Sequence, residues 1–233
     1  MCYQRSLFMN EIIKMVVGFD QRESVAYHTF VQSIIEKSSL PVSFIPLSIN
    51  TLKGYEEKHD DRSNDFVYSR FLTPYLNNFE GWAIFADGDM ICQADIKELW
   101  DLRDESKAVQ VVKHNYKTKA KKKYLGNKNE NYPKKNWSSL ILWNCSHPKN
   151  KKLTPNLISN QSGKYLHRFS WLDEEDIGEL NSEWNWLAIE YPKNKKAKII
   201  HYTLGTPCFE DYKKSDFSEI WYEKYNKILE GLE

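Results

Sequence analysis

Five apolar residues in a row, residues 82–86, are followed at once by two carboxylates with a glycine between them. An uninterrupted apolar run of this length is typical of a strand buried on both faces, as in a parallel sheet. Asp87 and Asp89 should then lie just past the strand, at the edge where open α/β sheets collect their ligands. Because Gly88 adds no side-chain bulk between them, both carboxylates could converge on one hard cation such as Mg²⁺ or Mn²⁺.

The chain before this run predicts the start of an α/β unit. A buried strand over residues 15–19 precedes a helix that Ser24 caps and that has apolar residues at helical spacing to Ile35. Residues 41–46 alternate as a second strand. This strand, helix, strand order opens a nucleotide-binding α/β unit, but Gly18 stands alone and the dinucleotide fingerprint is absent.

The rest of the chain continues the pattern without a repeat. Short helices are predicted over 66–76, 96–102 and 153–158, strands over 108–112, 137–145 and 197–202, and an amphipathic helix over 217–232. From a length of 233 residues we expect one α/β domain over residues 14–233, after an extension of residues 1–13.

The composition argues against several classes of partner. With 33 basic and 32 acidic residues, no global field directs the chain to nucleic acid or to a membrane. Four cysteines without C-x-x-C spacing indicate neither a zinc site nor a disulfide framework, and fit a reducing compartment. Neither a signal peptide nor an apolar run of ~18 residues is visible. We expect a cytoplasmic protein without a membrane span, for which peripheral membrane contact stays open.

His201 ends another apolar strand and is a candidate third ligand beside Asp87 and Asp89. An imidazole in the ligand set favours Mn²⁺ over Mg²⁺. Each residue also has a structural interpretation, because an isolated Asp-x-Asp is commonly a solvated turn and a strand-end histidine is commonly a hydrogen-bonded structural residue. Local sequence leaves these alternatives open.

Other polar residues near strand ends are candidates for substrate contacts. Asp20, Arg22 and Glu23 could read a nucleotide base and ribose, or form a solvated loop with a helix cap. Arg70 lies in an apolar segment, and a buried arginine needs a carboxylate or phosphate partner.

Three further features have two interpretations each. The lysine-rich residues 117–135 are predicted to be a mobile, solvated loop, although they could grip a phosphate. The acidic residues 173–176 could hold an acceptor hydroxyl or form a helix N-terminus. Several tryptophans could stack on a sugar or fill the core, namely Trp137, Trp143, Trp171, Trp184 and Trp186.

Five segments in this order resemble metal-dependent glycosyltransferases of the GT-A fold, in particular family 8, the glycogenin and lipopolysaccharide galactosyltransferase group. They are residues 17–27, 68–74, 85–90, 137–144 and 201–207. The resemblance spans about residues 14–210. It implies the GT-A architecture, a Rossmann-like, mixed but mainly parallel sheet flanked by helices.

The resemblance also implies roles for individual residues. Asp87, Asp89 and His201 would hold Mn²⁺, with Mg²⁺ as the alternative, and the ion would bridge the donor diphosphate. The other implied site residues are Gly18, Phe19, Asp20 and Arg22 along the nucleotide pocket, Gly88 and Gly205 near the donor, Arg70 at the Asp-x-Asp loop or donor sugar, Ser138 and Ser139 at the sugar and acceptor, and Glu175 and Asp176 as catalytic residues near the reacting carbon. Trp171 and Trp184 are the candidates for sugar stacking.

The implied activity is transfer of a hexose, with retention, from a nucleotide-diphosphate sugar to a carbohydrate or lipid-linked acceptor, with UDP as the default nucleotide. The chain departs from the family pattern where a late lysine normally contacts the diphosphate, because Gly205 is followed by Thr-Pro-Cys. A cation from the lysine-rich residues could replace it. Ser138 and Glu175 differ from the family's Asn and Gln, so the sugar is left open.

Two alternative functions remain from the sequence. The missing late lysine would suit a catalytically impaired nucleotide-sugar or carbohydrate-binding protein of the same fold. A nucleotidyltransferase would need a glycine-rich, basic loop after the first strand, and residues 20–23 do not form one.

Overall fold

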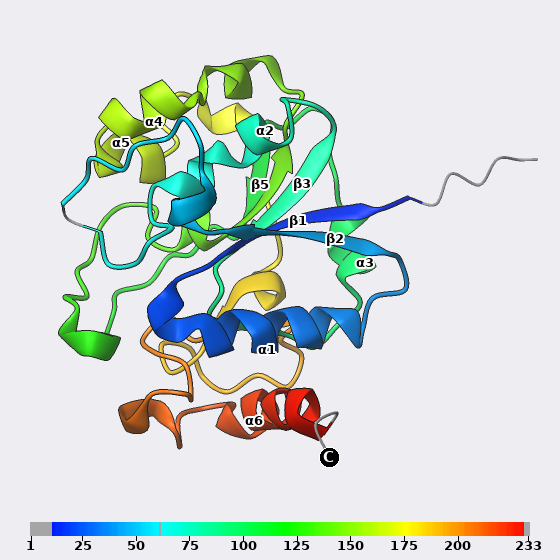
Figure 1. Ribbon diagram of the computed structural model, residues 1–233, viewed down its shortest axis with the longest axis vertical. Coiled ribbons are helices and arrows are strands. Elements are labelled where there is room, and N and C mark those ends of the chain that lie inside the picture. Colours follow the sequence, from blue (N-terminus) through cyan, green and yellow to red (C-terminus); the bar gives the residue numbers. More distant parts are fainter. Residues whose placement is uncertain (1–10, 61, 231–233) are drawn as a thin grey trace, which may run out of the picture.

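The computed structural model describes residues 11–60 and 62–230, in which a six-stranded sheet forms the centre (Figure 1). The strand order is β2-β1-β3-β6-β5-β7. Their bounds are β1 Ile13–Gly18, β2 Val42–Leu47, β3 Trp82–Ala86, β5 Val109–Val111, β6 Leu140–Asn144 and β7 Ile177–Glu179. Strand β6 runs against both of its neighbours, and the other five strands share one direction. The predicted mixed, mainly parallel sheet is therefore confirmed.

Helices cover both faces of the sheet, which explains the uninterrupted apolar run of β3. Every residue of β3 and β6 is buried. Helix α1 (Ser24–Ile35) covers one face, and the short helices α2 (Thr73–Leu76), α4 (Pro155–Asn160) and α5 (Gly163–His167) lie on the other side (Figure 1). Two apolar clusters fill the spaces on either side of the sheet. The parallel central strands are thus shielded from water on both faces.

A smaller sheet, in the order β4-β9-β8, begins directly after the two carboxylates. Its strands are β4 (Met90–Cys92), β8 (Trp186–Leu187) and β9 (Ile199–His201). Helix α3 (Ile96–Trp100) follows β4, and α6 (Ser218–Leu229) lies along α1 on the side away from the large sheet (Figure 1). The sequence did not predict β4, because three residues are too few to show a period.

Short 3₁₀ turns join many of these elements. They are η1 Gln21–Glu23, η2 Ile49–Thr51, η3 Ser69–Leu72, η4 Tyr124–Gly126, η5 Trp137–Ser139, η6 Pro148–Lys152, η7 Glu174–Asp176, η8 Ser182–Asn185 and η9 Glu210–Tyr212. The predicted helix over residues 66–76 consists of η3 and α2. No described helix combines the length and apolar character that crossing a bilayer requires.

Several predicted boundaries differ from the structure; residues 137–139 of a predicted strand, for example, form η5. Ser24 is the first residue of α1 and does not cap it; instead, the Asp20 carboxylate accepts a hydrogen bond from the Arg22 backbone N–H and caps η1, which leads into the helix. The fold also begins earlier than residue 14, because Ile13 is buried in β1 and Glu11 accepts a hydrogen bond from the Trp100 indole at 2.7 Å. Residues 1–10 of the predicted extension lie outside the described residues, so the domain division stays a prediction.

A buried ion pair links α6 to the end of α1, and it should make the free energy of unfolding fall at acid pH. Lys224 Nζ lies 2.8 Å from Glu36 Oε2, and both side chains are largely buried. Burial alone would raise the pKa of Glu36, but hydrogen bonds from Lys224, Gln32 and Lys227 lower it to about 2. Because this pKa lies below the ordinary 4.5, the stabilisation is complete above about pH 5 and is lost as pH falls from about 4.5 to about 2.

Glu36→Gln should lower the free energy of unfolding by about 3 kcal/mol at pH 7, which is the stabilisation that the lowered pKa of Glu36 represents, and it leaves Lys224 with Glu223 as its remaining ion-pair partner. Urea unfolding at several pH values should show the gap to the wild type narrowing between pH 5 and 3. The control is Asp101→Asn, which removes an exposed helical pair with Lys97 and should cost less than about 0.5 kcal/mol. A gap that stays constant with pH would contradict the role of the carboxylate charge.

Candidate active site

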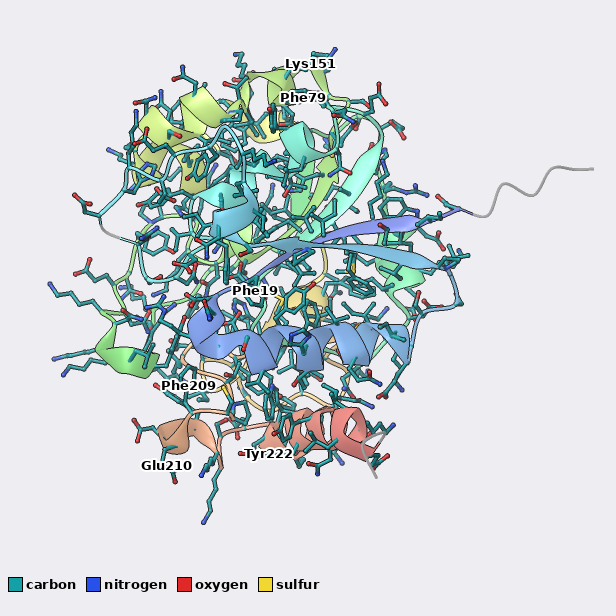
Figure 2. The ribbon with its side chains drawn as sticks, viewed as in Figure 1. Phe19, Phe79, Lys151, Phe209, Glu210 and Tyr222 are labelled. Carbon is teal, nitrogen blue, oxygen red and sulfur yellow. The ribbon has the colours of Figure 1, made fainter. Side chains whose placement is uncertain are left out.

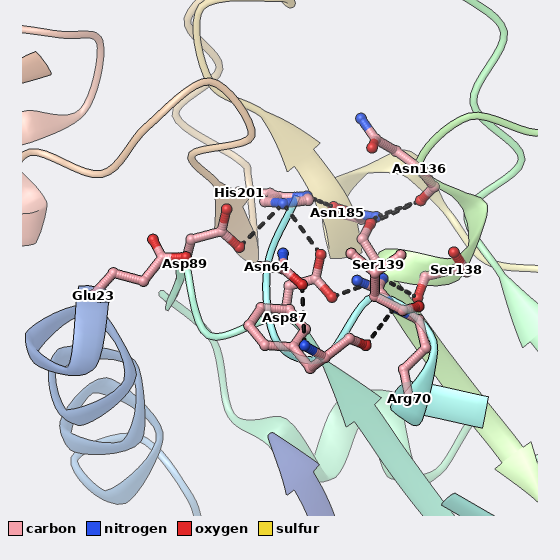
Figure 3. A network of polar contacts seen from close by, with 12 residues as sticks. Glu23, Asn64, Arg70, Asp87, Asp89, Asn136, Ser138, Ser139, Asn185 and His201 are labelled. Carbon is pink, nitrogen blue, oxygen red and sulfur yellow. Dashed lines mark hydrogen bonds and ion pairs between the residues drawn. The ribbon is translucent and has the colours of Figure 1, made fainter. Parts of the chain in front are cut away.

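Asp87, Asp89 and His201 converge on one space at the end of β3 (Figure 3). One ligand atom from each lies within 4.8 Å of the others. The His201 Nε2 atom is 3.3 Å from Asp89 Oδ1 and 3.9 Å from Asp87 Oδ2. The small sheet creates this geometry, because β4 and β9 pair with Met90 opposite His201 and the Tyr202 N–H donates to the Asp89 carbonyl. Residues more than 110 positions apart are thereby placed side by side.

Asn185 orients the His201 ring toward the carboxylates. Its side-chain oxygen lies 3.0 Å from His201 Nδ1, and an amide oxygen only accepts, so we assign the ring proton to Nδ1. The lone pair of Nε2 then faces the Asp89 carboxylate, and two acceptors at this distance repel each other unless a cation lies between them. An imidazole held by a second hydrogen bond, beside two buried carboxylates, fits a divalent cation such as Mn²⁺ or Mg²⁺.

Arg70 braces the first carboxylate. Its Nη1 atom is 2.8 Å from Asp87 Oδ1 and donates to the Ser138 carbonyl at 2.9 Å, while Nε donates to the Val67 carbonyl at 3.0 Å. The guanidinium also lies over the rings of Phe66 and Phe85. The sequence expectation that a buried Arg70 requires an anionic partner agrees with this contact, and the partner is Asp87.

Two acids of this site, Asp87 and Glu23, are harder to ionise than free side chains, whereas the nearby His201 outweighs burial and lowers the pKa of Asp89. Burial raises the pKa of Asp87 to about 6 even though Arg70 opposes the shift. Burial, followed by the negative charge of Asp89, raises the pKa of Glu23 to about 8. Glu23 lies beside Asp89 (Figure 3), with one oxygen bonded to the Tyr124 hydroxyl at 2.8 Å and the other buried without a hydrogen-bond partner among the described residues. Such a concentration of buried acid favours a bound cation.

With this geometry established, comparison with known proteins identifies the family. The model for "Glycosyl transferase family 8" matches residues 12–206. The chain belongs to glycosyl transferase family 8. It is 42% identical over 226 residues to Protein CDI of Arabidopsis thaliana, covering 92% of this chain and 87% of that protein.

Solved structures of glycosyltransferases share the fold of this family 8 enzyme. GlyE of Streptococcus pneumoniae superposes with a TM-score of 0.62 at 13% identity over 93% of this chain and 60% of GlyE. The galactosyltransferase LgtC, solved with donor and acceptor sugar analogs, superposes with a TM-score of 0.54 at 11% identity over 92% of this chain and 96% of LgtC. The bifunctional WbbM gives 0.58 at 15% identity over 94% of this chain. The chain spans about half the length of WbbM.

Four predicted site residues of this family 8 glycosyltransferase lie close to the carboxylates, namely Ser138, Ser139, Gly18 and Gly88. The Ser138 hydroxyl is 2.8 Å from His167 Nδ1, and the Ser139 carbonyl accepts the Asp87 backbone N–H at 2.9 Å. A Cβ added to Gly88 would lie 2.4 Å from the Gly18 carbonyl oxygen, so close backbone packing is what requires a glycine at position 88.

Two of the four predicted nucleotide-pocket residues, Asp20 and Arg22, line a separate hollow at the end of β1. Asp20 and Arg22 line a cavity of about 500 Å³ together with Arg62 and Asp65. Arg22 Nε donates to Asp20 at 2.9 Å, so these two residues fulfil the helix-cap interpretation and also border open space. Phe19, labelled in Figure 2, packs its ring edge-on against Tyr27.

Glu175 and Asp176 do not lie where a catalytic role requires. They are in η7, directly before β7, and Ile177 pairs in parallel with Val109. Since β7 and β3 run in the same direction, this is the opposite edge of the sheet from Asp87. The Asp176 carboxylate accepts the Asp173 backbone N–H in a capping box and pairs with Lys149 at 2.6 Å. The structure therefore contradicts the catalytic prediction and supports the helix-terminus interpretation.

Trp171 and Trp184 are core residues, contrary to the predicted sugar contacts. Trp171 is buried against Phe71, Phe169 and Trp143, and its indole donates to Asn150 at 3.2 Å. Trp184 is 2% exposed in the cluster beneath the sheet. Neither ring faces a ligand space.

The lysine-rich residues 117–135 are not a uniformly solvated loop. Tyr124 is buried, and its backbone N–H donates to the Leu204 carbonyl at 2.7 Å. Its ring stacks on the ring of Phe209, which is labelled in Figure 2. A Cβ on Gly205 would lie 2.5 Å from the Tyr212 ring and 3.1 Å from Tyr124 Cβ, so this glycine serves the same packing. The predicted mobile loop is wrong for this part of the segment.

This packing holds Lys123 close enough to the carboxylates for their charges to act on it. Burial lowers the pKa of Lys123, whereas the nearby charges of Asp89 and Asp87 act to raise it. Lys123 and Asn185 are the site residues that the sequence did not single out. Asn185 had one indirect signal, its place between Trp184 and Trp186, and Lys123 was one lysine among many.

Proposed function

We propose that this family 8 glycosyltransferase transfers a hexose, with retention, from a nucleotide-diphosphate sugar to a hydroxyl of a carbohydrate or lipid-linked acceptor, using Mn²⁺. UDP is the default nucleotide. The observation that supports the proposal is the cluster of Asp87, Asp89 and His201, in which Asn185 turns the imidazole lone pair toward two buried carboxylates. Mg²⁺ is the alternative ion, and the donor diphosphate is the negative partner that such an ion would bind.

The chain's own residues divide the work around this cluster. When bound, the metal ion would act as a Lewis acid that offsets the charge developing on the diphosphate. Arg70 holds Asp87 in place from the side of Ser138, and Lys123 adds a positive charge near both aspartates. We assign to Lys123 the diphosphate contact that a late lysine makes in the family pattern. Asp20 and Arg22 are the residues we assign to the nucleotide, since their cavity lies at the end of β1.

The transfer balances without an added reactant. The acceptor oxygen forms a bond to the anomeric carbon as the bond from that carbon to the diphosphate oxygen breaks. The electron pair of the broken bond and the acceptor proton both pass to the released nucleoside diphosphate. No covalent nucleophile from the protein is required.

Thermal unfolding with UDP and Mn²⁺ tests the proposal. At about 100 times the dissociation constant, UDP should stabilise the protein by about 2.7 kcal/mol, which raises Tm by about 5–10 °C, and only when Mn²⁺ is present. Lys123→Gln should raise the Kd for UDP about tenfold, because it removes one charge-assisted contact. The matched control is Lys122→Gln, which removes the neighbouring exposed lysine and should leave the Kd unchanged.

Failure of every nucleoside diphosphate to stabilise the protein in the presence of Mn²⁺ would contradict the proposal. Stabilisation without any release of UDP from UDP-sugars would favour the second candidate, a catalytically impaired nucleotide-sugar-binding protein. The absence of the family's late lysine is the observation behind that candidate.

A further inference from the structure

A second cavity, of about 720 Å³, opens beside the carboxylate cluster. Its volume is within the range of small-molecule sites. The lysine-rich residues form one wall, and residues 162–168 form part of another. The cavity is joined to the cluster by contacts that run from His167 to the Ser138 hydroxyl at 2.8 Å, from the Ser138 carbonyl to Arg70, and from Arg70 to Asp87. Lys123 lines the cavity, and its positive charge acts to lower the pKa of both Asp87 and Asp89.

The walls of this cavity are strongly basic, unlike the chain as a whole. Five cationic side chains line it, with Glu130 as the single carboxylate among the lining residues; the five are Lys123, Lys128, Lys135, Lys164 and Arg168. The whole chain has a net charge of only +1. The excess of positive charge is therefore a local property of this cavity.

Most of these cations lack a counter-ion among the described residues. Within the described ranges, no carboxylate forms an ion pair with Lys128, Lys164 or Arg168. Several lysines elsewhere on the surface do have such partners, for example Lys134 with Glu174 and Lys198 with Glu98. Unpaired cations gathered around one space repel one another, and an anionic ligand would relieve that repulsion.

Two other side chains that line the cavity already form hydrogen bonds within the protein. Lys135 Nζ donates to Asn129 Oδ1 and to the Glu130 carbonyl, both at close range. Burial lowers the pKa of His167 to about 3, so at neutral pH this ring is uncharged and free to bond the Ser138 hydroxyl. The groups left for a ligand are therefore Lys128, Lys164 and Arg168, with Lys123 toward the cluster.

We propose that this cavity binds the acceptor and that the acceptor bears a phosphate group, held by Lys128, Lys164 and Arg168. The inference rests on the proposed function, because it places the acceptor hydroxyl next to the donor at the carboxylate cluster. A soluble sugar phosphate and a lipid-linked sugar diphosphate share the required chemistry. Arginine and lysine are the side chains that bind phosphate in proteins, arginine in a bidentate manner.

The test measures release of UDP from a UDP-sugar in the presence of Mn²⁺ and a panel of acceptors. Glucose 1-phosphate and glucose 6-phosphate should stimulate release far more than methyl glucoside does. The triple variant Lys128→Gln/Lys164→Gln/Arg168→Gln should lose at least about 100-fold in kcat/KM for the phosphorylated acceptor, since each lost charged contact is worth about tenfold. A second arm uses N-acetylglucosamine diphosphate on a short polyprenyl chain, and the arm that responds identifies the source of the phosphate.

A matched triple variant removes the same charge elsewhere. Lys151→Gln/Lys196→Gln/Lys214→Gln alters three exposed lysines that do not line the cavity and should behave as the wild type (Figure 2 labels Lys151). Slow, acceptor-independent hydrolysis of the donor by this control variant should stay within about twofold of the wild type.

The control reaction separates the two possible failures. If no UDP-sugar is hydrolysed or transferred by the wild type, the proposed function fails. The phosphate-bearing acceptor is refuted, while the glycosyltransferase proposal stands, by either of two results. In the first, the wild type hydrolyses the donor, and phosphorylated acceptors stimulate UDP release no more than neutral acceptors do. In the second, the cavity variant loses activity equally with phosphorylated and with neutral acceptors.

Discussion

Asp89→Asn should lower kcat/KM for the sugar donor about 10³-fold or more, because the divalent ion loses a charged ligand and its Lewis acidity is worth several kcal/mol in the transition state. Asp89 is the better choice than Asp87, since Asp89 lies 3.3 Å from His201 Nε2 and, among the described residues, forms no ion pair with an arginine, whereas Asp87 also holds the Arg70 guanidinium. The substitution keeps the shape of the side chain. It also removes one negative charge from the neighbourhood of Glu23.

Two measurements separate loss of metal from loss of fold. Without metal, the variant should unfold at a Tm equal to or above that of the wild type, because like charges no longer crowd the site. Added Mn²⁺ should raise Tm for the wild type and not for the variant. Asp216→Asn, at an exposed position, is the matched control. Donor turnover that survives in Asp89→Asn, or that is unaffected by a chelator in the wild type, would refute the assignment of metal ligands.

Arg70→Met should have the largest effect on stability. The guanidinium joins Asp87, the Ser138 carbonyl and the Val67 carbonyl in a region shielded from water. Removing one partner of a buried ion pair leaves the other charge uncompensated, so we expect a loss of about 3–5 kcal/mol in the free energy of unfolding. The corresponding fall in Tm is about 10–15 °C for a chain of this size. Chemical denaturation at pH 7 measures it directly.

A double-mutant cycle tests whether the Asp87 contact is responsible. Arg70→Met/Asp87→Asn should recover part of the lost stability, because the unpaired carboxylate is neutral in the double variant. Donor turnover should not return, since both variants damage the metal cluster. A loss below about 1 kcal/mol for Arg70→Met, or strictly additive effects in the cycle, would show that the ion pair does not stabilise the fold.

Strand ends were the part of the site that local sequence could predict. Five apolar residues followed by two acids indicate that the strand ends before Asp87, and the buried setting of Arg70 requires an anion nearby. Both requirements follow from the cost of burying a charge without a partner, which depends on immediate neighbours in the sequence. The family also follows from the sequence, because five ordered segments are more specific than any single motif.

The predictions for Glu175, Asp176, Trp171 and Trp184 failed for a different reason. An acidic cluster before a strand has the same local pattern at either edge of a sheet, and only the parallel pairing of β7 with β5 places it away from Asp87. A tryptophan beside polar residues is likewise consistent with core or cleft. Local pattern contains no information on which edge or which face a segment occupies.

The sequence by itself determined the α/β class, the two carboxylates at the end of β3 and the likeness to family 8. Tertiary structure decided which distant residues complete the site. Pairing of β9 with β4 brings His201 to Asp89, and the packing of the lysine-rich residues against Leu204 holds Lys123 where the charges of the same acids act on it. The physical reason is the distance over which each effect acts. Adjacent residues determine whether an apolar run is buried, whereas the electrostatic field at a site is the sum of charges that only the folded chain brings together.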